Sequence, residues 1–165
     1  MRSPCINIKG CRFSNQISEA YSTGYGITTA DAGFRILNYC NSAVVPCPED
    51  SIKQCTFTNL YAGINSNNSI YSTNSLYVND ALFTNNSYGI KLNAVDNATI
   101  INSIFNIGVN KRDETLCSLE GKSASGVGIE LTGCTGFAIE ENTFTTNQGD
   151  YGRYLTGISI AETEA

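Results

Sequence analysis

The sequence predicts an all-β solenoid, a parallel β-helix with about 22 residues per turn. Three observations predict it. A phenylalanine recurs five times with similar neighbours, a Gly-Ile pair follows each copy, and 22 residues separate Phe83 from Phe105. A repeat of roughly 20 to 50 residues is typical of stacked units, because each unit buries its apolar face only against the next one.

The first two strands of each turn are predicted from the residues before the phenylalanine. A branched aliphatic stands five positions before it and a small or short side chain two before it, as in Ile8, Cys11, Phe13; Ile52, Cys55, Phe57; Val78, Ala81, Phe83; Ile100, Ser103, Phe105; Ile139, Asn142, Phe144. Side chains alternate along a strand, so the short residue and the phenylalanine share a face, but the aliphatic does not. A one-residue bend restores inward pointing, and we expect it at Gly10, Gln54, Asp80, Asn102 and Glu141.

The third strand of each turn follows from the Gly-Ile pair. In Gly89-Ile90-Lys91-Leu92 the alternation turns Ile90 and Leu92 inward. We expect the glycine to mark a backbone angle that a Cβ atom would resist. Three short strands per turn, each pairing with its copy in the next turn, complete the coil.

Two insertions interrupt the repeat, at residues 28–51 and 106–127. The first contains Pro46 and Pro48, which cannot serve a central strand, so it is predicted to stand off the coil. The second holds the densest charge of the chain, including Lys111 and Arg112. Loops carry recognition more often than the scaffold does, so the insertions are the expected contact surfaces.

The amino-acid composition limits the cellular compartments and the classes of binding partner that suit this chain. The 165 residues are predicted to form one segment of a parallel β-helix. Their net charge of −5 argues against nucleic acid as a partner. No apolar stretch is long enough to cross a membrane. Seven cysteines favour an oxidising, extracellular setting. Cys40 and Cys47 flank a short loop and could form a local bridge; Cys11 and Cys55 are either small core residues or a second bridge.

The segments CTFTNLYAGI (55–64), ALFTNNSYGI (81–90) and GIELTGCTGFAIEENTF (128–144) carry a family resemblance. They resemble right-handed parallel β-helix repeat proteins, and look most similar to secreted and cell-surface members from Bacteroidetes, many of which use type IX secretion. The resemblance implies an extracellular or bacterial cell-surface location. It implies little about activity, because the same coil serves polysaccharide lyases, glycosidases and non-catalytic surface proteins.

Candidate functional residues are few. The outward columns stack no two acids on consecutive turns, and the weak acid–base candidates are Asp80, Lys91, Asp96 and Glu130, with a solvated surface as the simpler interpretation. No nucleotide or metal motif is present, so no cofactor is predicted. Tyr25 and Tyr88 share a repeat position; they either stack on sugar rings or cover the coil corners.

The sequence therefore favours a non-catalytic structural or adhesive module of the cell surface. The alternatives are part of a carbohydrate-active enzyme and an accessory module that binds glycans through the tyrosine edge at Tyr25 and Tyr88. Lys111 and Arg112, in the second insertion, are further candidates for binding. The repeat begins near residue 1 and the last half-turn has no capping element, so we expect a longer parent chain, or other cell-surface proteins, as partners.

Overall fold

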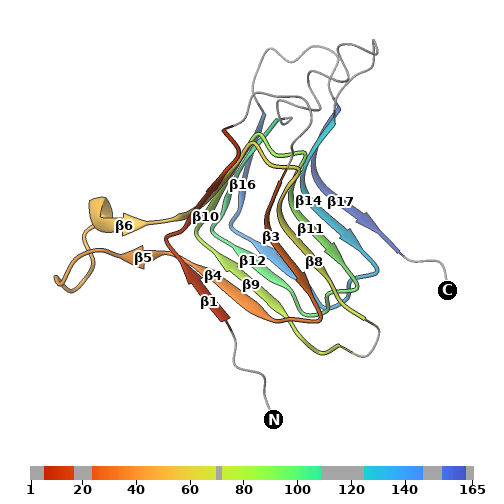
Figure 1. The fold of residues 1–165 in the computed structure, drawn as a ribbon, viewed down its shortest axis with the longest axis horizontal. Coiled ribbons are helices and arrows are strands. Elements are labelled where there is room, and N and C mark those ends of the chain that lie inside the picture. The colour runs from red at the N-terminus through yellow and green to blue at the C-terminus, as the bar shows by residue number, and fades with distance from the viewer. Residues whose placement is uncertain (1–5, 17–23, 70–71, 109–124, 147–153, 163–165) are drawn as a thin grey trace.

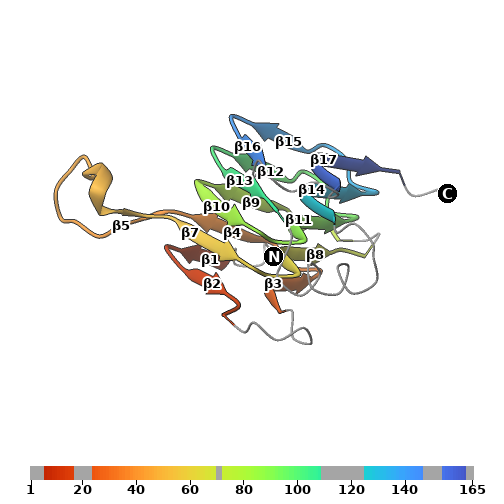
Figure 2. The same cartoon turned by 90° about the horizontal axis from the view of Figure 1, so that it is seen from above.

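The computed structural model describes residues 6–16, 24–69, 72–108, 125–146 and 154–162. Within them, three five-stranded parallel sheets surround one core, and each turn of the chain contributes one strand to each sheet. Figure 1 looks along the coil and shows the three sheets as the sides of a triangle; Figure 2 shows the turns stacked on one another. The predicted parallel β-helix is confirmed.

The strands are named by their place in the three sheets. The first sheet contains β1 (Ile6–Lys9), β4 (Phe34–Leu37), β9 (Leu76–Asn79), β12 (Thr99–Ile101) and β15 (Ala138–Glu140). The second sheet contains β2 (Arg12–Ser14), β7 (Cys55–Thr58), β10 (Ala81–Thr84), β13 (Ile104–Ile107) and β16 (Thr143–Thr146). The third sheet contains β3 (Tyr25–Ala30), β8 (Ala62–Asn67), β11 (Tyr88–Asn93), β14 (Ser125–Thr132) and β17 (Tyr154–Ala161).

The core is built from columns of like side chains. The five repeat phenylalanines pair in register, and their rings stack with centroids 4.7 to 4.9 Å apart and planes within 11° of parallel. Phe83 lies opposite Phe105, as the repeat predicts. Opposite them, Ile64, Ile90 and Ile129 form a second column with no exposed surface. Stacked aromatic rings add about 0.5–1.5 kcal/mol per pair beyond the burial of their area.

Sharp bends join the first sheet to the second. Gly10, Asp80, Asn102 and Glu141 adopt left-handed backbone with φ between 51° and 57°, which confirms four of the five predicted bends. The short side chain that follows satisfies a backbone donor across turns. Ser103 Oγ accepts from the Ala81 N–H at 3.2 Å, and Asn142 Oδ1 accepts from the Ser103 N–H at 2.9 Å. At these bends, the backbone N–H groups of Ala81 and Ser103 therefore keep a hydrogen-bond partner.

The glycine before the inward isoleucine is needed for space at Gly26, Gly63, Gly89 and Gly128, where the next turn lies close. A Cβ atom at Gly89 would lie 2.5 Å from the carbonyl oxygen of Gly128, and one at Gly63 would lie 2.6 Å from that of Gly89. Neither glycine has positive φ. The expectation of a special backbone angle was therefore wrong: the column is glycine because the next turn approaches too closely for a side chain.

The first insertion is shorter than predicted and forms a projecting arm. Phe34–Leu37, inside the predicted 28–51 loop, is strand β4 of the first sheet, and Ile36 pairs with Ile8 and Val78. Ile36 thus takes the place that the repeat assigned to Ile52. The arm itself consists of β5 (Tyr39–Cys40), a 3₁₀ turn η1 (Glu49–Ser51) and β6 (Ile52–Lys53), and β5 pairs antiparallel with β6.

The second insertion lies mostly outside the described residues, which stop at 108 and resume at 125. Lys111 and Arg112 fall in this gap. Its flanks belong to the coil, since β13 ends at Ile107 and β14 begins at Ser125. In the part of the chain that is described, no helix has the length and apolar character needed to cross a membrane.

Candidate functional site

Asp80 anchors the base of the arm. It lies at the bend between β9 and β10, where its Oδ2 accepts a hydrogen bond from Asn38 Nδ2 at 2.7 Å and its Oδ1 accepts one from Gln54 Nε2. Asn38 and Gln54 are the residues at which the chain leaves the coil and returns to it. Both carboxylate oxygens are therefore engaged in holding the arm, which leaves Asp80 a poor general base or nucleophile.

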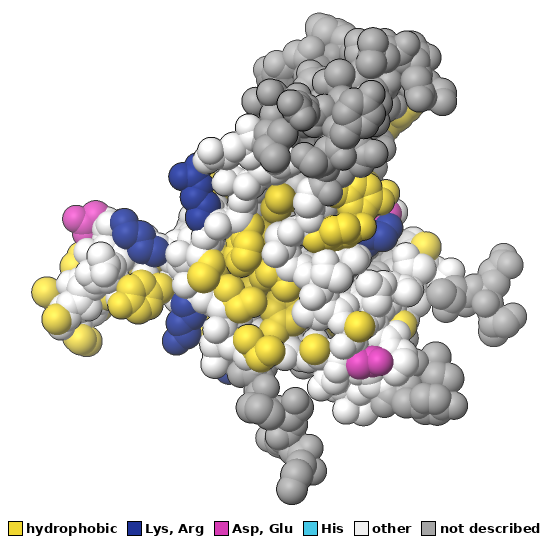
Figure 3. All heavy atoms as spheres, in the orientation of Figure 1, with side chains coloured by type: hydrophobic (Ala, Val, Ile, Leu, Met, Phe, Trp, Pro, Cys, Tyr) yellow, Lys and Arg dark blue, Asp and Glu magenta, His cyan; other side chains and the backbone are white. Residues whose placement is uncertain are grey.

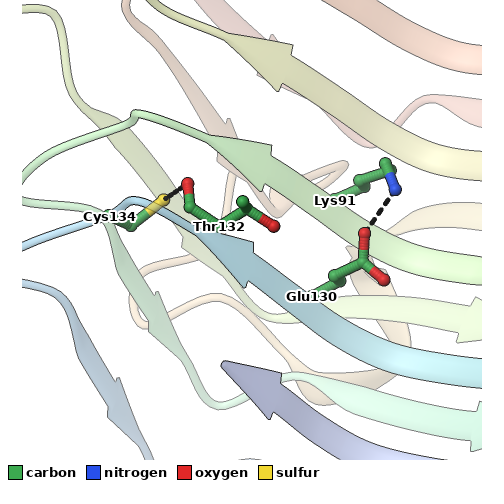
Figure 4. A network of polar contacts seen from close by, with 4 residues as sticks. All are labelled: Lys91, Glu130, Thr132 and Cys134. Carbon is green, nitrogen blue, oxygen red and sulfur yellow. Dashed lines mark hydrogen bonds and ion pairs between the residues drawn. The ribbon is translucent and has the colours of Figure 1, made fainter. Parts of the chain in front are cut away.

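Lys91 and Glu130 form an ion pair on the outer face of the third sheet. They are opposite each other in neighbouring strands β11 and β14, and Figure 4 shows the two side chains pointing toward one another. Burial opposes the positive charge of Lys91, but the hydrogen bond and the charge of Glu130 offset it and raise the pKa of the lysine. The Lys91 Nζ also lies 4.3 Å from the ring centroid of Tyr88. Lys91 is therefore held as a cation between two partners.

Asp96 lies at a different corner, where the third sheet leads into the first. Its Oδ1 accepts from the backbone N–H of Thr135 at 2.9 Å and from its hydroxyl at 2.7 Å. The four acid–base candidates therefore occupy two corners and one sheet face of the coil, and they do not converge on one site. Lys91 and Glu130 are the only two that the structure brings together.

The tyrosines form an edge-to-face row along the start of the third sheet. Tyr25 and Tyr61 have ring centroids 5.4 Å apart at 73°, and Tyr61 and Tyr88 are 5.4 Å apart at 67°. Tyr25 is 49 % exposed, whereas the ring of Tyr88 is covered by Lys91. Sugar stacking needs an open ring face, and this row offers one chiefly at Tyr25.

A groove lies where the arm meets the coil. Its volume is about 540 Å³, and it is lined by residues from the first bend, the second sheet and the arm: Gly10, Arg12, Glu49, Ile52, Lys53, Gln54, Thr56 and Asp80. Figure 3 shows Lys and Arg side chains gathered beside the arm. Within the described residues, neither Arg12 nor Lys53 forms an ion pair.

The sequence did not predict this groove. Ile52 and Lys53 stand at the spacing of a coil strand before Phe57, so counting back from the phenylalanine placed them in the coil instead of the arm. The alternation of Phe34 and Ile36 was the available signal for β4, because both are fully or almost fully buried.

The cysteines of the described ranges form one disulfide and leave Cys11, Cys55 and Cys134 free. Cys40 and Cys47 form the local disulfide, with Cα atoms 6.0 Å apart. Cys134 donates weakly to the Thr132 carbonyl oxygen at 3.5 Å (Figure 4). Cys55 is fully buried, and burial is the main cause that raises its pKa. Its thiol donates to the carbonyl oxygens of Ile8 and Leu37 at 3.7 and 3.6 Å.

A family model described as "Periplasmic copper-binding protein (NosD)" matches residues 5–163. The chain belongs to the NosD family. Its three-sided parallel coil is the right-handed β-helix of that family. Comparison with curated proteins and with solved structures finds no match.

The copper in the description of the NosD family is not matched by the described residues. Copper(II) favours imidazole and copper(I) favours thiolate or thioether ligands, and the chain contains no histidine. No group of three His, Cys, Asp or Glu in the described ranges could hold a metal ion. The one neighbouring pair of free thiols there, Cys11 and Cys55, has no third His, Cys, Asp or Glu beside it to complete a metal site. These residues do not fit a copper centre.

Proposed function

We propose that this chain is a non-catalytic, exported β-helix module of structural or adhesive type, and that the arm is its contact element. The observation that carries the proposal is the arm itself, which projects from the coil and is closed by the Cys40–Cys47 disulfide (Figures 1 and 2). A scaffold whose described residues bring no reactive groups together, and which carries a projection held by a disulfide, is suited to binding.

The end of the arm is apolar. Val45 is 92 % exposed and Val44 is 61 % exposed, and Figure 3 shows hydrophobic side chains gathered at that end. Acidic Glu49 and Asp50 follow in η1. The disulfide limits the freedom of the loop, so less entropy is lost when the valines dock. The chemistry fits an apolar pocket of another cell-surface protein, bordered by basic groups.

The enzyme alternative has one supporting observation, the groove that contains Glu49 and Asp80. Glycoside hydrolysis requires two carboxyl groups roughly 5–10 Å apart, one free to donate a proton and one free to attack or activate water. The oxygens of Asp80 are bonded to Asn38 and Gln54. We therefore propose that the groove holds no hydrolytic pair.

Location and glycan binding are part of the same proposal. The family description names a periplasmic protein, and the oxidised Cys40–Cys47 pair agrees with an exported chain. A cell-surface position reached by type IX secretion, and continuity with a longer parent chain, stay predictions. Glycan recognition through Tyr25 is a weaker candidate, because its neighbours Tyr61 and Tyr88 meet edge to face and Lys91 covers Tyr88.

The test measures binding and product formation separately. The purified chain is presented to immobilised outer-membrane proteins and to a polysaccharide panel, beside a variant with Val44→Ser and Val45→Ser. The matched control is Ile104→Ser, which removes an exposed aliphatic from the coil at 36 % exposure. We expect protein binding that the arm variant reduces at least tenfold and the control retains. Release of sugar products would overturn the non-catalytic assignment; binding that both variants retain would remove the arm from the contact.

A further inference from the structure

Cys11 and Cys55 occupy equivalent positions on neighbouring turns. Each stands two residues before a stacked phenylalanine, and the following residues, Arg12 and Thr56, pair in register. The Cys11 backbone N–H donates to Cys55 Sγ at 3.3 Å, so the buried thiol lies directly against the backbone of the first turn. In-register parallel strands are roughly 4.8 Å apart. That separation lies within the range of about 4.4–6.8 Å that Cα atoms span in disulfides.

The two thiols differ in access. Cys11 is exposed, whereas Cys55 has no exposed surface. An exposed thiol reacts first with a reagent from solution, and a buried neighbour can then displace that reagent. The Cys40–Cys47 disulfide closes the arm, and the base of the arm packs on Gly10, next to Cys11. A Cβ atom at Gly10 would lie 3.0 Å from Tyr39 Cβ and 3.2 Å from Lys53 Cβ.

We propose that Cys11 and Cys55 form a second disulfide, which links the first turn to the second when the folded chain meets a small disulfide such as oxidised glutathione. The Cys11 thiolate attacks one sulfur of the reagent, a mixed disulfide forms, and one glutathione thiolate leaves. The Cys55 thiol loses its proton and attacks Cys11 Sγ, which forms the protein disulfide and releases the second glutathione. The protein loses two hydrogen atoms, and one oxidised glutathione becomes two reduced ones.

The link would act at an edge of the described coil. Strands β1, β2 and β3 are end strands of their three sheets in the described chain, so each is bonded to one neighbour only. A covalent bond from the turn of β2 to β7 would hold this edge closed. It would also enclose the arm, because the arm lies between Cys11 and Cys55 in the sequence.

The experiment uses the full chain with Cys5, Cys117 and Cys134 replaced by serine and the Cys40–Cys47 bond intact. After incubation with oxidised glutathione, we expect the free thiols to fall from two to none. The mass should fall by two hydrogen atoms, and a proteolytic peptide should join Cys11 to Cys55. The midpoint of thermal unfolding should rise by roughly 6–16 °C, because a disulfide that closes a loop of this length restricts the unfolded chain.

Single variants separate the two steps. Cys55→Ser should stop as a stable glutathione adduct on Cys11, and Cys11→Ser should take up no glutathione. Cys55→Ser changes a core residue and could impair folding. The thiol count and mass of the parent chain, which keeps both Cys11 and Cys55, therefore test the proposal without the single variants. Two thiols that persist after exhaustive oxidation, or a glutathione adduct that persists on the parent, would overturn the proposal. Neither result would affect the proposed role of the arm, which is measured through Val44 and Val45.

Discussion

The close approach of neighbouring turns at Gly89 gives the sharpest prediction, a comparison of Gly89→Ala with Gly157→Ala. The added carbon at Gly89 would lie 2.5 Å from the Gly128 carbonyl oxygen and 2.9 Å from a ring carbon of Phe105. Non-bonded heavy atoms prefer roughly 3.5–4.0 Å. Both obstacles are fixed, one in a strand ladder and the other in the stacked column. Overpacking costs about 1–3 kcal/mol, and we expect Gly89→Ala to reach about 3 kcal/mol.

Gly157 is the matched control in the same column. An added carbon there would meet its nearest neighbour, Phe144, at 3.7 Å, an ordinary contact. Neither glycine has positive φ, so alanine strains neither backbone. Replacing a glycine whose conformation suits alanine stabilises a protein by about 0.4–1 kcal/mol through the unfolded chain. The two variants should therefore differ by about 3–4 kcal/mol in their free energies of unfolding.

Urea unfolding followed by far-ultraviolet circular dichroism measures both free energies, and the dependence on urea should stay the same in the two variants. The melting temperature of Gly89→Ala should fall by roughly 6–12 °C. Equal losses in the two variants would show that backbone conformation, not the approach of the next turn, requires the glycines. A loss below about 0.5 kcal/mol at Gly89 would show that the turns can move apart.

Three further outcomes follow from single contacts. Asn86→Ala should cost about 2–3 kcal/mol in urea unfolding, because its buried amide bonds one backbone N–H at 2.9 Å and one carbonyl at 3.0 Å in the preceding turn; an unchanged midpoint would contradict this. Lys91→Met should cost less than about 1 kcal/mol, since the ion pair with Glu130 is partly exposed, and a larger, salt-sensitive loss would refute that view. The Ser69 backbone N–H donates to Asp31 and lowers the pKa of that carboxyl below its ordinary 3.8. The stability that this hydrogen bond contributes is therefore complete above about pH 4, and it is lost as acid protonates Asp31 in the folded chain. Asp31→Asn should reduce the loss of stability below pH 4, and an unchanged acid profile would count against the bond.

The columns of the coil could be predicted because they repeat a local pattern. Phe83 and Phe105 superpose since equal spacing places like residues over like in every turn, and the parity of alternation required the bends at Asp80 and Asn102. The arm could not be placed in the same way. Ile52 stands at the repeat spacing before Phe57 by coincidence, and only the pairing of Ile36 with Val78 shows which residue lies in the coil.

The candidate site shows the same limit. Asp96 follows Lys91 by only five residues. Ala94, which lies between them, and Asn97, which follows, have left-handed backbone and turn the chain through a corner. The side chains of Lys91 and Asp96 therefore belong to different parts of the coil. Asp80 and Gln54 are far apart in sequence and are bonded to each other at the base of the arm. Such contacts depend on the corner of the coil from which the insertion projects. The spacing of residues in the sequence does not show which corner that is.

The amino-acid sequence by itself determined the repeat, its length and its inward residues, because the residues that must be buried recur at the same positions in every turn. The tertiary structure alone decided the groove at the arm, the engagement of Asp80 and the difference in exposure between Cys11 and Cys55. These depend on lateral neighbours from different turns, whose distances follow from the stacking of the coil and from the point at which the arm departs.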